Sequence, residues 1–383
     1  MIKNFFSPPF FYFTFLPFVF WPNFVDKYEL PKVIFFIFLT FIIIGFNFRG
    51  IVAQNLIKLK IKRIQLLIFT LIIIFTLTSG LAGNFSRSFW GQYFRYEGLL
   101  TLITYFLFFL IISSLDWPVD AWGKAISLGG ILISLLIICQ AIGFYLLRLP
   151  IYNYNGRLAG FFGNPNFAAA YLALAFPFCC YRLQGSTLKS VNWFLFLAAI
   201  LLTGSRSGLL AFILVTVFIA SQKAKRKLWI AAGALVVAIP LMVAIIWRPA
   251  SSFDARPIIW QKALEAWSKK PILGWGIENF EFAFRSTLNR YDFDLQMIRV
   301  DKAHNEFLEI LVASGVIGLL VYLLVIKEAF QALWPKRADR WARANLLGFG
   351  AYLVLSSLNV LNVTSYLFFY FILANASRLK ESN

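Results

Sequence analysis

Long runs of apolar residues recur along the whole chain and restrict what it can fold into. A helix needs about 20 apolar residues to cross the hydrocarbon core of a bilayer, and it satisfies its backbone hydrogen bonds internally. Twelve runs approach or reach this length, at about residues 5–22, 30–48, 64–82, 96–115, 125–147, 166–182, 190–204, 206–221, 228–247, 304–326, 344–357 and 360–377. The sequence therefore predicts an all-α polytopic membrane protein of about twelve transmembrane helices, with residues 1–383 in a single integral membrane domain.

The composition agrees with this fold class. Hydrophobic residues make up 60% of the chain, charged residues only 14%, and the mean hydropathy is +0.74, which excludes an ordinary soluble domain. The first run contains no small-residue cleavage site, so we interpret it as a retained helix and not as a signal peptide. The cysteines lie inside the apolar runs without metal-ligand spacing, and we expect neither a metal nor a cofactor.

The net charge of +19 is distributed in a way that indicates membrane topology and argues against nucleic acid as a partner. Three connections between the runs are densely basic, and all three fall on one side if twelve helices alternate. They contain Lys58, Lys60, Lys62, Arg63, Lys223, Lys225, Arg226, Lys227, Lys327, Lys336, Arg337, Arg340 and Arg343. The positive-inside rule makes that side cytoplasmic, so both termini are predicted to be cytoplasmic.

This topology places four connections on the outer side, at residues 23–29, 83–95, 148–165 and 248–303. The last connection, between the ninth and tenth helices, is the only one long enough to form a small subdomain. Its apolar residues suggest short amphipathic helices on the membrane surface, and Pro271-x-x-Gly274-x-Gly276 suggests a fixed turn below one of them. Because long ordered loops are usually functional, we expect 248–303 to be an external catalytic loop.

Three outward-facing helix starts combine a capping residue with an adjacent cationic or titratable side chain. Asn164 is a natural N-cap before Pro165, a hydroxyl cap precedes the helix at Arg206, and we expect Asp301 to cap a helix with His304 in its first turn. Helix N-termini favour anions because their N–H groups are unpaired. With arginines at positions 157, 206 and 256, these helix starts suit a phosphate or diphosphate.

The only histidine of the chain, His304, begins the pattern His-Asn-x9-Gly-x-x-Gly. On a continuous helix, His304, Gly315 and Gly318 share one face, where the glycines let a neighbouring helix approach closely. Glu309 lies four residues after Asn305, so we expect these two side chains to pair along the helix.

Taken together, these segments resemble the conserved blocks of the superfamily of O-antigen ligases, Wzy-type O-antigen polymerases and bacterial O-oligosaccharyltransferases. The blocks are Gly156-Arg-x2-Gly160-x3-Asn164-Pro-Asn166, Thr203-Gly-Ser-Arg206-Ser-Gly208, Arg256-x3-Trp260 and His304-Asn305-x9-Gly315-x2-Gly318, in the order of the family. The resemblance covers about residues 83–327 and does not distinguish between the branches.

The resemblance implies a membrane-embedded glycosyltransferase with a GT-C-like fold, active in surface polysaccharide or lipopolysaccharide biosynthesis in the bacterial cytoplasmic (inner) membrane. Such enzymes transfer a glycan from an undecaprenyl-diphosphate carrier to a hydroxyl of a glycan, a lipid A core or a protein, and they are inverting and metal-independent. Arg206 and Arg256 match the essential arginines best, and His304 is the expected base for the acceptor hydroxyl, with a reference pKa of about 6.5. Further candidate substrate contacts are Arg157, Asn164, Asn166, Ser205, Trp260, Asn305 and Arg95.

Other readings of the same residues remain open. A transporter of an anionic or lipid-linked substrate also has about twelve helices, and a related peptidoglycan-type polymerase would use an aspartate such as Asp292, Asp294 or Asp301 as its base. Asp292-Phe-Asp294 is also an Asp-x-Asp tripeptide, which holds a divalent metal in some glycosyltransferases, although a solvated loop is the commoner meaning. A non-enzymatic scaffold for polysaccharide assembly is a third alternative.

The charge distribution predicts which side of the membrane each loop occupies. A topology reporter fused near residue 225 should be active in the cytoplasm, and one fused near residue 285 should be active outside it, because only the first position lies in a densely basic connection. Protease accessibility of the same fusions measures this independently. The reverse assignment would remove the basis for an external active site.

Overall fold

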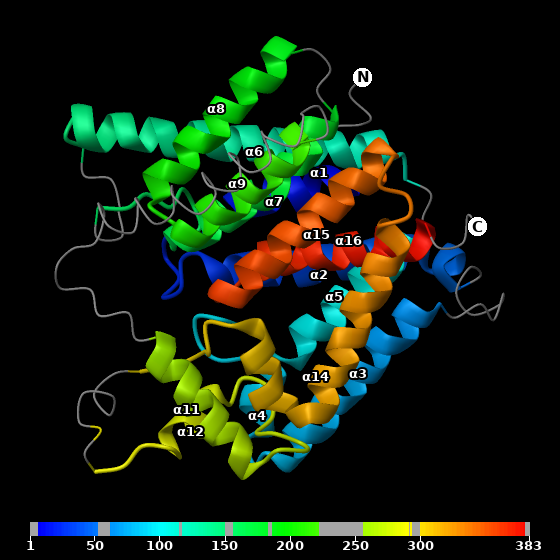
Figure 1. Ribbon diagram of the computed structural model, residues 1–383, viewed down its shortest axis with the longest axis vertical. Coiled ribbons are helices and arrows are strands. Elements are labelled where there is room, and N and C mark those ends of the chain that lie inside the picture. Colours follow the sequence, from blue (N-terminus) through cyan, green and yellow to red (C-terminus); the bar gives the residue numbers. More distant parts are fainter. Residues whose placement is uncertain are drawn as a thin grey trace.

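The computed structural model describes residues 7–52, 62–114, 117–149, 156–182, 186–221, 256–290, 292 and 299–379 (Figure 1). Every regular element in these ranges is helical, which confirms the predicted all-α class. The run at 228–247 and Asp294 lie outside the described residues.

The helices follow one another with short connections. In the first half of the chain they are α1 (Pro8–Phe10), the π-helix η2 (Phe11–Phe15), the 3₁₀-helix η3 (Leu16–Phe18), α2 (Glu29–Val52), α3 (Arg63–Leu81), α4 (Phe85–Trp90), α5 (Leu99–Ser114), α6 (Val119–Ala141), the π-helix η5 (Ile142–Leu146) and α7 (Pro165–Arg182). In the second half they are α8 (Ser186–Thr203), α9 (Arg206–Ser221), α11 (Arg256–Lys269), α12 (Phe280–Arg285), α14 (Glu306–Leu333), α15 (Arg340–Leu358) and α16 (Val363–Leu379).

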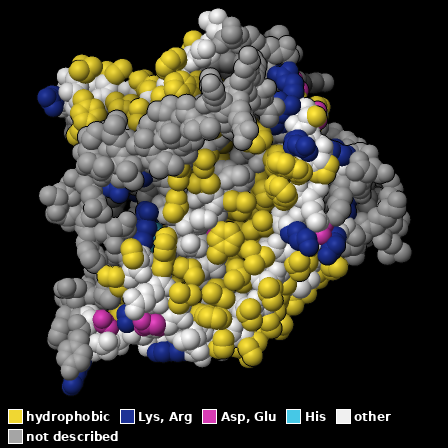
Figure 2. All heavy atoms as spheres, in the orientation of Figure 1, with side chains coloured by type: hydrophobic (Ala, Val, Ile, Leu, Met, Phe, Trp, Pro, Cys, Tyr) yellow, Lys and Arg dark blue, Asp and Glu magenta, His cyan; other side chains and the backbone are white. Residues whose placement is uncertain are grey.

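Several of these helices suit a membrane by length and composition. Four described spans are long and apolar enough to cross one: Glu29–Asn47, Arg63–Leu81, Val119–Leu146 and Glu306–Leu333. Shorter apolar helices are Leu99–Ser114, Ser190–Thr203 and Arg206–Ala220. On α3 and α14 large apolar side chains remain exposed, such as Leu77 and Leu320, and Figure 2 shows a broad hydrophobic surface on this side of the molecule. Such a surface suits lipid as solvent, while the total of twelve spans stays a prediction.

The first apolar run differs from the helix that the sequence predicts at 5–22. Described helical structure covers only residues 8–18, and the chain becomes extended at Val19. A helix of this length reaches about half of the roughly 30 Å hydrocarbon core. Its residues Tyr12, Phe13 and Leu16 are fully buried, so the segment packs inside the bundle rather than against lipid. Hydropathy alone does not distinguish these two environments.

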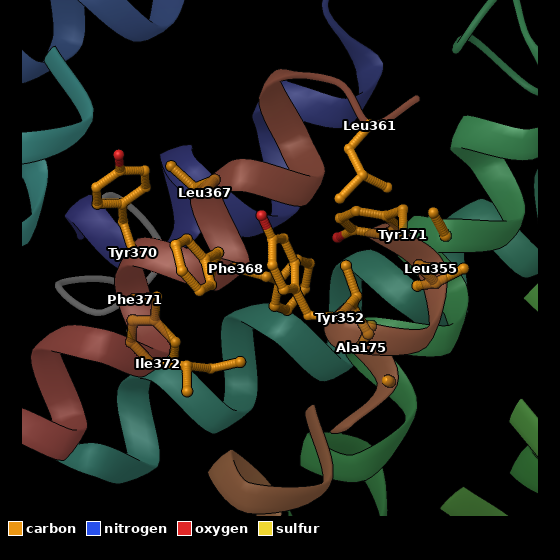
Figure 3. Close-up of a cluster of buried hydrophobic side chains, with 14 of the residues drawn as sticks. Tyr171, Ala175, Tyr352, Leu355, Leu361, Leu367, Phe368, Tyr370, Phe371 and Ile372 are labelled. Atoms are coloured by element: carbon orange, nitrogen blue, oxygen red, sulfur yellow. The ribbon is translucent and has the colours of Figure 1, made fainter. Parts of the chain in front are cut away.

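The main core lies where α7, α15 and α16 meet, in the middle of the molecule (Figure 3). Aromatic rings fill it: Tyr352 stacks on Phe369 at a centroid distance of 4.3 Å, and Tyr171 meets Phe368 edge-on at 5.6 Å. Offset-stacked and edge-to-face pairs of this kind add to the stabilisation from buried area. The centre of the bundle is thus filled by close-packed aromatic side chains.

A second, smaller core lies under α11 and α12, at the bottom of Figure 1. Ile259, Ala263, Phe280 and Phe284 pack there against residues 300–312. The part of 248–303 that the structure describes is therefore a packed helical unit, as the amphipathic pattern predicts. Its position at a membrane surface remains a prediction.

Helix α14 is interrupted where the sequence predicts a continuous glycine face. Gly315 has φ 64° and ψ −167°, and the turn at 271–276 pairs with the broken backbone. Trp275 N donates to Val312 O (2.8 Å), Gly276 N to Ala313 O (2.8 Å), and Val316 N to Pro271 O (2.9 Å). His304, Gly315 and Gly318 therefore do not share one helical face, and the close partner of Gly315 is this turn, not another helix.

The pairing of the turn at 271–276 with the backbone around Gly315, here called the interlock, leaves no room for added methyl groups. A single methyl group at a glycine of this interlock should therefore lower the stability of the fold strongly. A Cβ at Gly315 would collide with the carbonyl of Ile272, and one at Gly274 (φ 69°) would lie 2.5 Å from Val312 O. The conformation of Gly315 is nearly exclusive to glycine, so Gly315→Ala and Gly274→Ala should each lower the free energy of unfolding by at least about 1–3 kcal/mol. Thermal unfolding of the purified protein measures this.

Gly350 provides the matched control, because a Cβ there meets nothing within 4 Å and the residue lies inside α15. Gly350→Ala should be neutral or stabilising by up to about 1 kcal/mol. Equal melting temperatures for all three variants would contradict the interlock.

Candidate functional site

The start of α7 is joined to the end of α8 by Arg157. Its Nε donates to Thr203 O (2.8 Å) and its Nη2 to Asn166 Oδ1 (2.8 Å). Asn164 caps α7, because its Oδ1 accepts from Asn166 N (2.9 Å), as the sequence predicts. The guanidinium of Arg157 is thus fixed between two helix ends through bonds to uncharged oxygens.

The start of α9 lies directly beside this junction. Ser205 caps the helix through its Oγ, which accepts from Gly208 N (3.3 Å), and Arg206 is the first helical residue. A Cβ on Gly208 would lie 2.5 Å from Ala169 Cβ, so the first turn of α9 presses closely against α7. The Arg206 side chain is exposed at this N-terminus.

The C-terminal end of α15 and the residue that follows it contact α9, α11 and the start of α14, and no sequence pattern predicts these contacts. Asn359 Nδ2 donates to Ser207 Oγ, while Asn359 Oδ1 accepts from Arg256 Nη2 (3.4 Å). Ser357 O accepts from Asn305 Nδ2 (3.0 Å). The only trace in the sequence is Asn359 between two apolar runs, followed by Asn362 near the start of the second run.

His304 precedes α14 and does not lie in its first turn. The helix is capped by Asn305, whose Oδ1 accepts from Phe307 N (3.0 Å) and Leu308 N (3.1 Å), because this side chain is the one within reach of the unpaired N–H groups. His304 adopts a left-handed conformation (φ 54°) and is half-buried. The predicted cap, Asp301, lies farther back and binds Arg95 Nε instead (2.6 Å).

A buried charged cluster lies under the turn that carries His304. Lys302 Nζ contacts Glu278 Oε1 (2.5 Å) and Glu309 Oε1 (3.5 Å), and Glu309 Oε2 accepts from Ala303 N (2.8 Å). The helical spacing predicts that Glu309 pairs with Asn305. In the structure Glu309 instead pairs with Lys302 and with the backbone N–H of Ala303. Burial lowers the pKa of Lys302, but the surrounding carboxylates outweigh burial and raise it, so the lysine stays charged.

One further contact fixes the same turn from outside the cluster. Trp260 Nε1 donates to Ala303 O (3.0 Å), which ties α11 to the residue before His304. The position of His304 thus depends on contacts of Trp260, Lys302 and Glu309. Helical periodicity relates none of these three residues to His304.

The structure distributes the candidate residues along one continuous region. Arg157, Asn164, Asn166, Ser205 and Arg206 lie at the starts of α7 and α9. Arg256 binds Asn359 after α15, and Asn305 binds Ser357 in its last turn. Trp260 binds Ala303 next to His304, and Arg95 binds Asp301. Asp292 lies apart from these residues. It accepts from Asn289 N (2.9 Å) and pairs with Lys262 (3.6 Å). Within the described ranges, no three His, Cys, Asp or Glu residues are placed to hold a metal ion.

Comparison with known proteins identifies part of this region. Residues 191–323 match the family model described as O-antigen ligase, which confirms the resemblance found in the sequence. The matched segment contains Arg206, Arg256 and His304, whereas Arg95, Arg157 and Asn359 lie outside it. No curated protein matches the chain.

The Arg95–Asp301 pair predicts a pH-dependent stability. Burial raises the pKa of Asp301, but the charge and hydrogen bond of Arg95 outweigh burial and lower it. A lowered folded-state pKa contributes stability above the unfolded value of about 3.9, and this stability is lost as pH falls through the folded pKa. Asp301→Asn should therefore lower the melting temperature near neutral pH, and its difference from wild type should shrink below about pH 4.

The background variant Arg95→Met tests the assigned cause. In that background Asp301→Asn should lose most of its pH-dependent effect, because the partner charge is gone. A difference between wild type and Asp301→Asn that stays constant from neutral to acid pH would contradict the pairing.

Proposed function

We propose that this protein transfers a glycan from an undecaprenyl-diphosphate carrier to an acceptor hydroxyl on the outer side of the bacterial cytoplasmic membrane. The observation that carries the proposal is the junction at Asn359, which holds the starts of α9 and α11 together. Two residues before Asn359, Ser357 O accepts from Asn305, which caps α14 and follows His304 directly. The family match covers these three residues.

The donor chemistry requires positive charge that is already in place. Breaking the bond between the anomeric carbon and the diphosphate leaves the bonding electron pair on the diphosphate, so negative charge develops there. Arg206 and Arg256 are the first residues of α9 and α11, where helix N-termini add partial positive charge. Fixed guanidinium groups stabilise this charge without a metal, and Arg157 adds a third.

The acceptor hydroxyl needs a base on the opposite side of the anomeric carbon. In a single displacement its oxygen forms the new glycosidic bond while His304 takes the proton and the diphosphate leaves. This step inverts the anomeric configuration and needs no covalent enzyme intermediate. The contacts of Trp260, Lys302 and Glu309 around His304 support this role, because they fix the backbone on which the imidazole stands.

The alternative with an aspartate base has less support. Asp301 is bound to Arg95, whose charge lowers its pKa, and a carboxylate with a lowered pKa is a weaker base. Asp292 is engaged by Lys262 and by a backbone N–H away from the three arginines. A transporter is also less well supported, because the candidate residues gather at helix ends rather than halfway along the helices.

The first prediction from this mechanism concerns the arginines. Arg206→Ala and Arg256→Ala should each abolish most transfer from a lipid-linked glycan and weaken donor binding, because each loses a charge-assisted contact to the diphosphate. Lysine at either position should retain partial activity at best, since it lacks the bidentate fork. The measurement is transfer and donor retention in one membrane preparation.

Arg340 offers a matched control, because it is also the first residue of a helix, α15, and is also exposed, but it lies in a predicted cytoplasmic connection. Arg340→Ala should transfer glycan at nearly the wild-type rate. Wild-type turnover in both Arg206→Ala and Arg256→Ala would refute the diphosphate assignment.

The second prediction concerns His304. His304→Asn tolerates the left-handed backbone but cannot accept a proton, and His304→Gly removes the ring while relaxing the backbone. Both should lower the transfer rate by about 10²–10⁴-fold while donor binding stays intact, because general-base catalysis contributes about this much. A collapse of donor binding with an unchanged rate per bound donor would instead make His304 a diphosphate ligand.

A further inference from the structure

A cleft of about 700 Å³ is lined in part by the ion-paired side chains of Arg95 and Asp301. Its walls come from residues 25–29, 92–95, 162–167, 299 and 301. Segments of four separate connections thus meet around one cleft. These are the same four connections that the charge distribution predicts to lie outside the membrane. Asp301 on its wall is three residues from His304, and Asn164 on another wall caps α7.

Two large aromatic side chains of the connection between α4 and α5 line this cleft. Tyr93 is 43% exposed and Phe94 49% exposed, with ring centroids 4.0 Å apart. Phe94 has φ 71°, a left-handed conformation that is costly for a bulky residue. Exposed apolar area combined with backbone strain does not stabilise a fold, so both features indicate a binding surface.

The backbone around these rings is tightly held. Gln92 N donates to Glu278 Oε2 (2.8 Å), and Gln92 O accepts from Arg95 N and Tyr96 N (2.9 Å each). Gly91 has no room for a side chain, because a Cβ there would lie 2.6 Å from Glu97 N. The two rings are therefore presented in a fixed position, which lowers the entropic cost of binding.

The same segment offers a hydrogen-bond acceptor that the fold leaves unused. The Gln92 side chain lines the cleft, is only 3% exposed, and its Oε1 has no hydrogen-bond partner among the described residues. A buried polar atom without a partner costs about 1–3 kcal/mol. A ligand with a hydroxyl donor removes this cost.

The acidic and basic side chains that line the cleft are equal in number, whereas the proposed diphosphate site of Arg157, Arg206 and Arg256 is positively charged. Its lining contains three acidic residues, Asp26, Glu29 and Asp301, and three basic ones, Lys27, Arg95 and Arg299. Arg95 pairs with Asp301, Asp26 accepts from the backbone at the start of α2, and Glu29 accepts from Asn362. No excess positive charge is left for a phosphate, so the surface suits a ligand without net charge.

We infer that this cleft binds a neutral sugar of the acceptor glycan, with one face of the ring on Tyr93 and Phe94 and a hydroxyl donating to Gln92. Apolar ring faces together with a few fixed polar groups are what a small saccharide complements. Asp301 lines the cleft and lies three residues before His304 in the chain, so under the proposed function a sugar there belongs to the acceptor. The identification of this sugar with the acceptor rests on the proposed function; the sugar site itself does not.

The experiment measures sugar binding without any donor. The full chain is purified into lipid nanodiscs, which avoids sugar-based detergents, and saturation-transfer NMR is recorded with lactose and maltose as neutral probes. Glucose 1-phosphate serves as the anionic probe, and empty nanodiscs give the background. We expect saturation transfer to the neutral disaccharides and weaker transfer to the anionic probe.

Three variants test the individual contacts. Phe94→Gly removes the ring and relaxes the left-handed backbone, so its folding is not at risk; Tyr93→Ala removes the second ring, and Gln92→Leu removes the amide. Each should raise the apparent Kd of the neutral probes by about tenfold. Phe85→Ala is the matched control, because Phe85 is also an exposed aromatic (48%) but lies on α4 away from the cleft.

Each result separates this inference from the proposed function. The sugar site is refuted if wild type binds neither disaccharide, if glucose 1-phosphate binds more tightly, or if Phe94→Gly binds as Phe85→Ala does. Binding that depends on Phe94, in a protein that transfers no glycan from a lipid-linked donor, would support the sugar site and reject the proposed function.

Discussion

The ion pair between Lys302 and Glu278 is the contact on which both sides of the site depend. Glu278 also accepts from Gln92 N, which fixes the segment that carries Tyr93 and Phe94. Lys302 is two residues before His304 and also contacts Glu309, which accepts from the intervening Ala303 N. A buried pair is only weak evidence for stability, since its desolvation cost is high. Its value here is geometric, because it fixes two distant segments relative to each other.

Features that depend on neighbours in sequence could be predicted, whereas those that depend on distant backbone could not. The caps at Asn164 and Ser205 follow from local chemistry, since each side chain bonds to an N–H two or three residues ahead. The sequence favours Asp301 as the cap of α14, because nothing in it reveals that Arg95 binds that carboxylate. Two capping residues in one short stretch are distinguished only by such a tertiary contact.

The same limit applies to the glycines and to Asn359. The sequence pattern predicts a helix-packing role for Gly315 and a separate turn at 271–276, yet backbone hydrogen bonds join that turn to the chain around Gly315. Asn359 joins Ser207 and Arg256 over more than 100 residues of sequence, and no spacing rule relates such positions. In contrast, the charge distribution grouped four connections on one side, and segments from all four line the cleft beside Arg95. The side of the membrane that these connections occupy stays a prediction.

The separation of charge across this region has a chemical consequence under the proposed function. Both substrates of a glycan transferase carry sugars, but only the donor carries a diphosphate. A cationic surface at the starts of α9 and α11 attracts that group, and a cleft with balanced charge offers it no advantage over water. Aromatic rings and one unpaired amide bind a neutral sugar without competing for the anion. The two substrates are then oriented by different forces, and the acceptor hydroxyl, not a second diphosphate, is presented to His304. Specificity then comes from two sources. The arginines attract the diphosphate of the donor, and the cleft, which has no excess positive charge, does not compete for it.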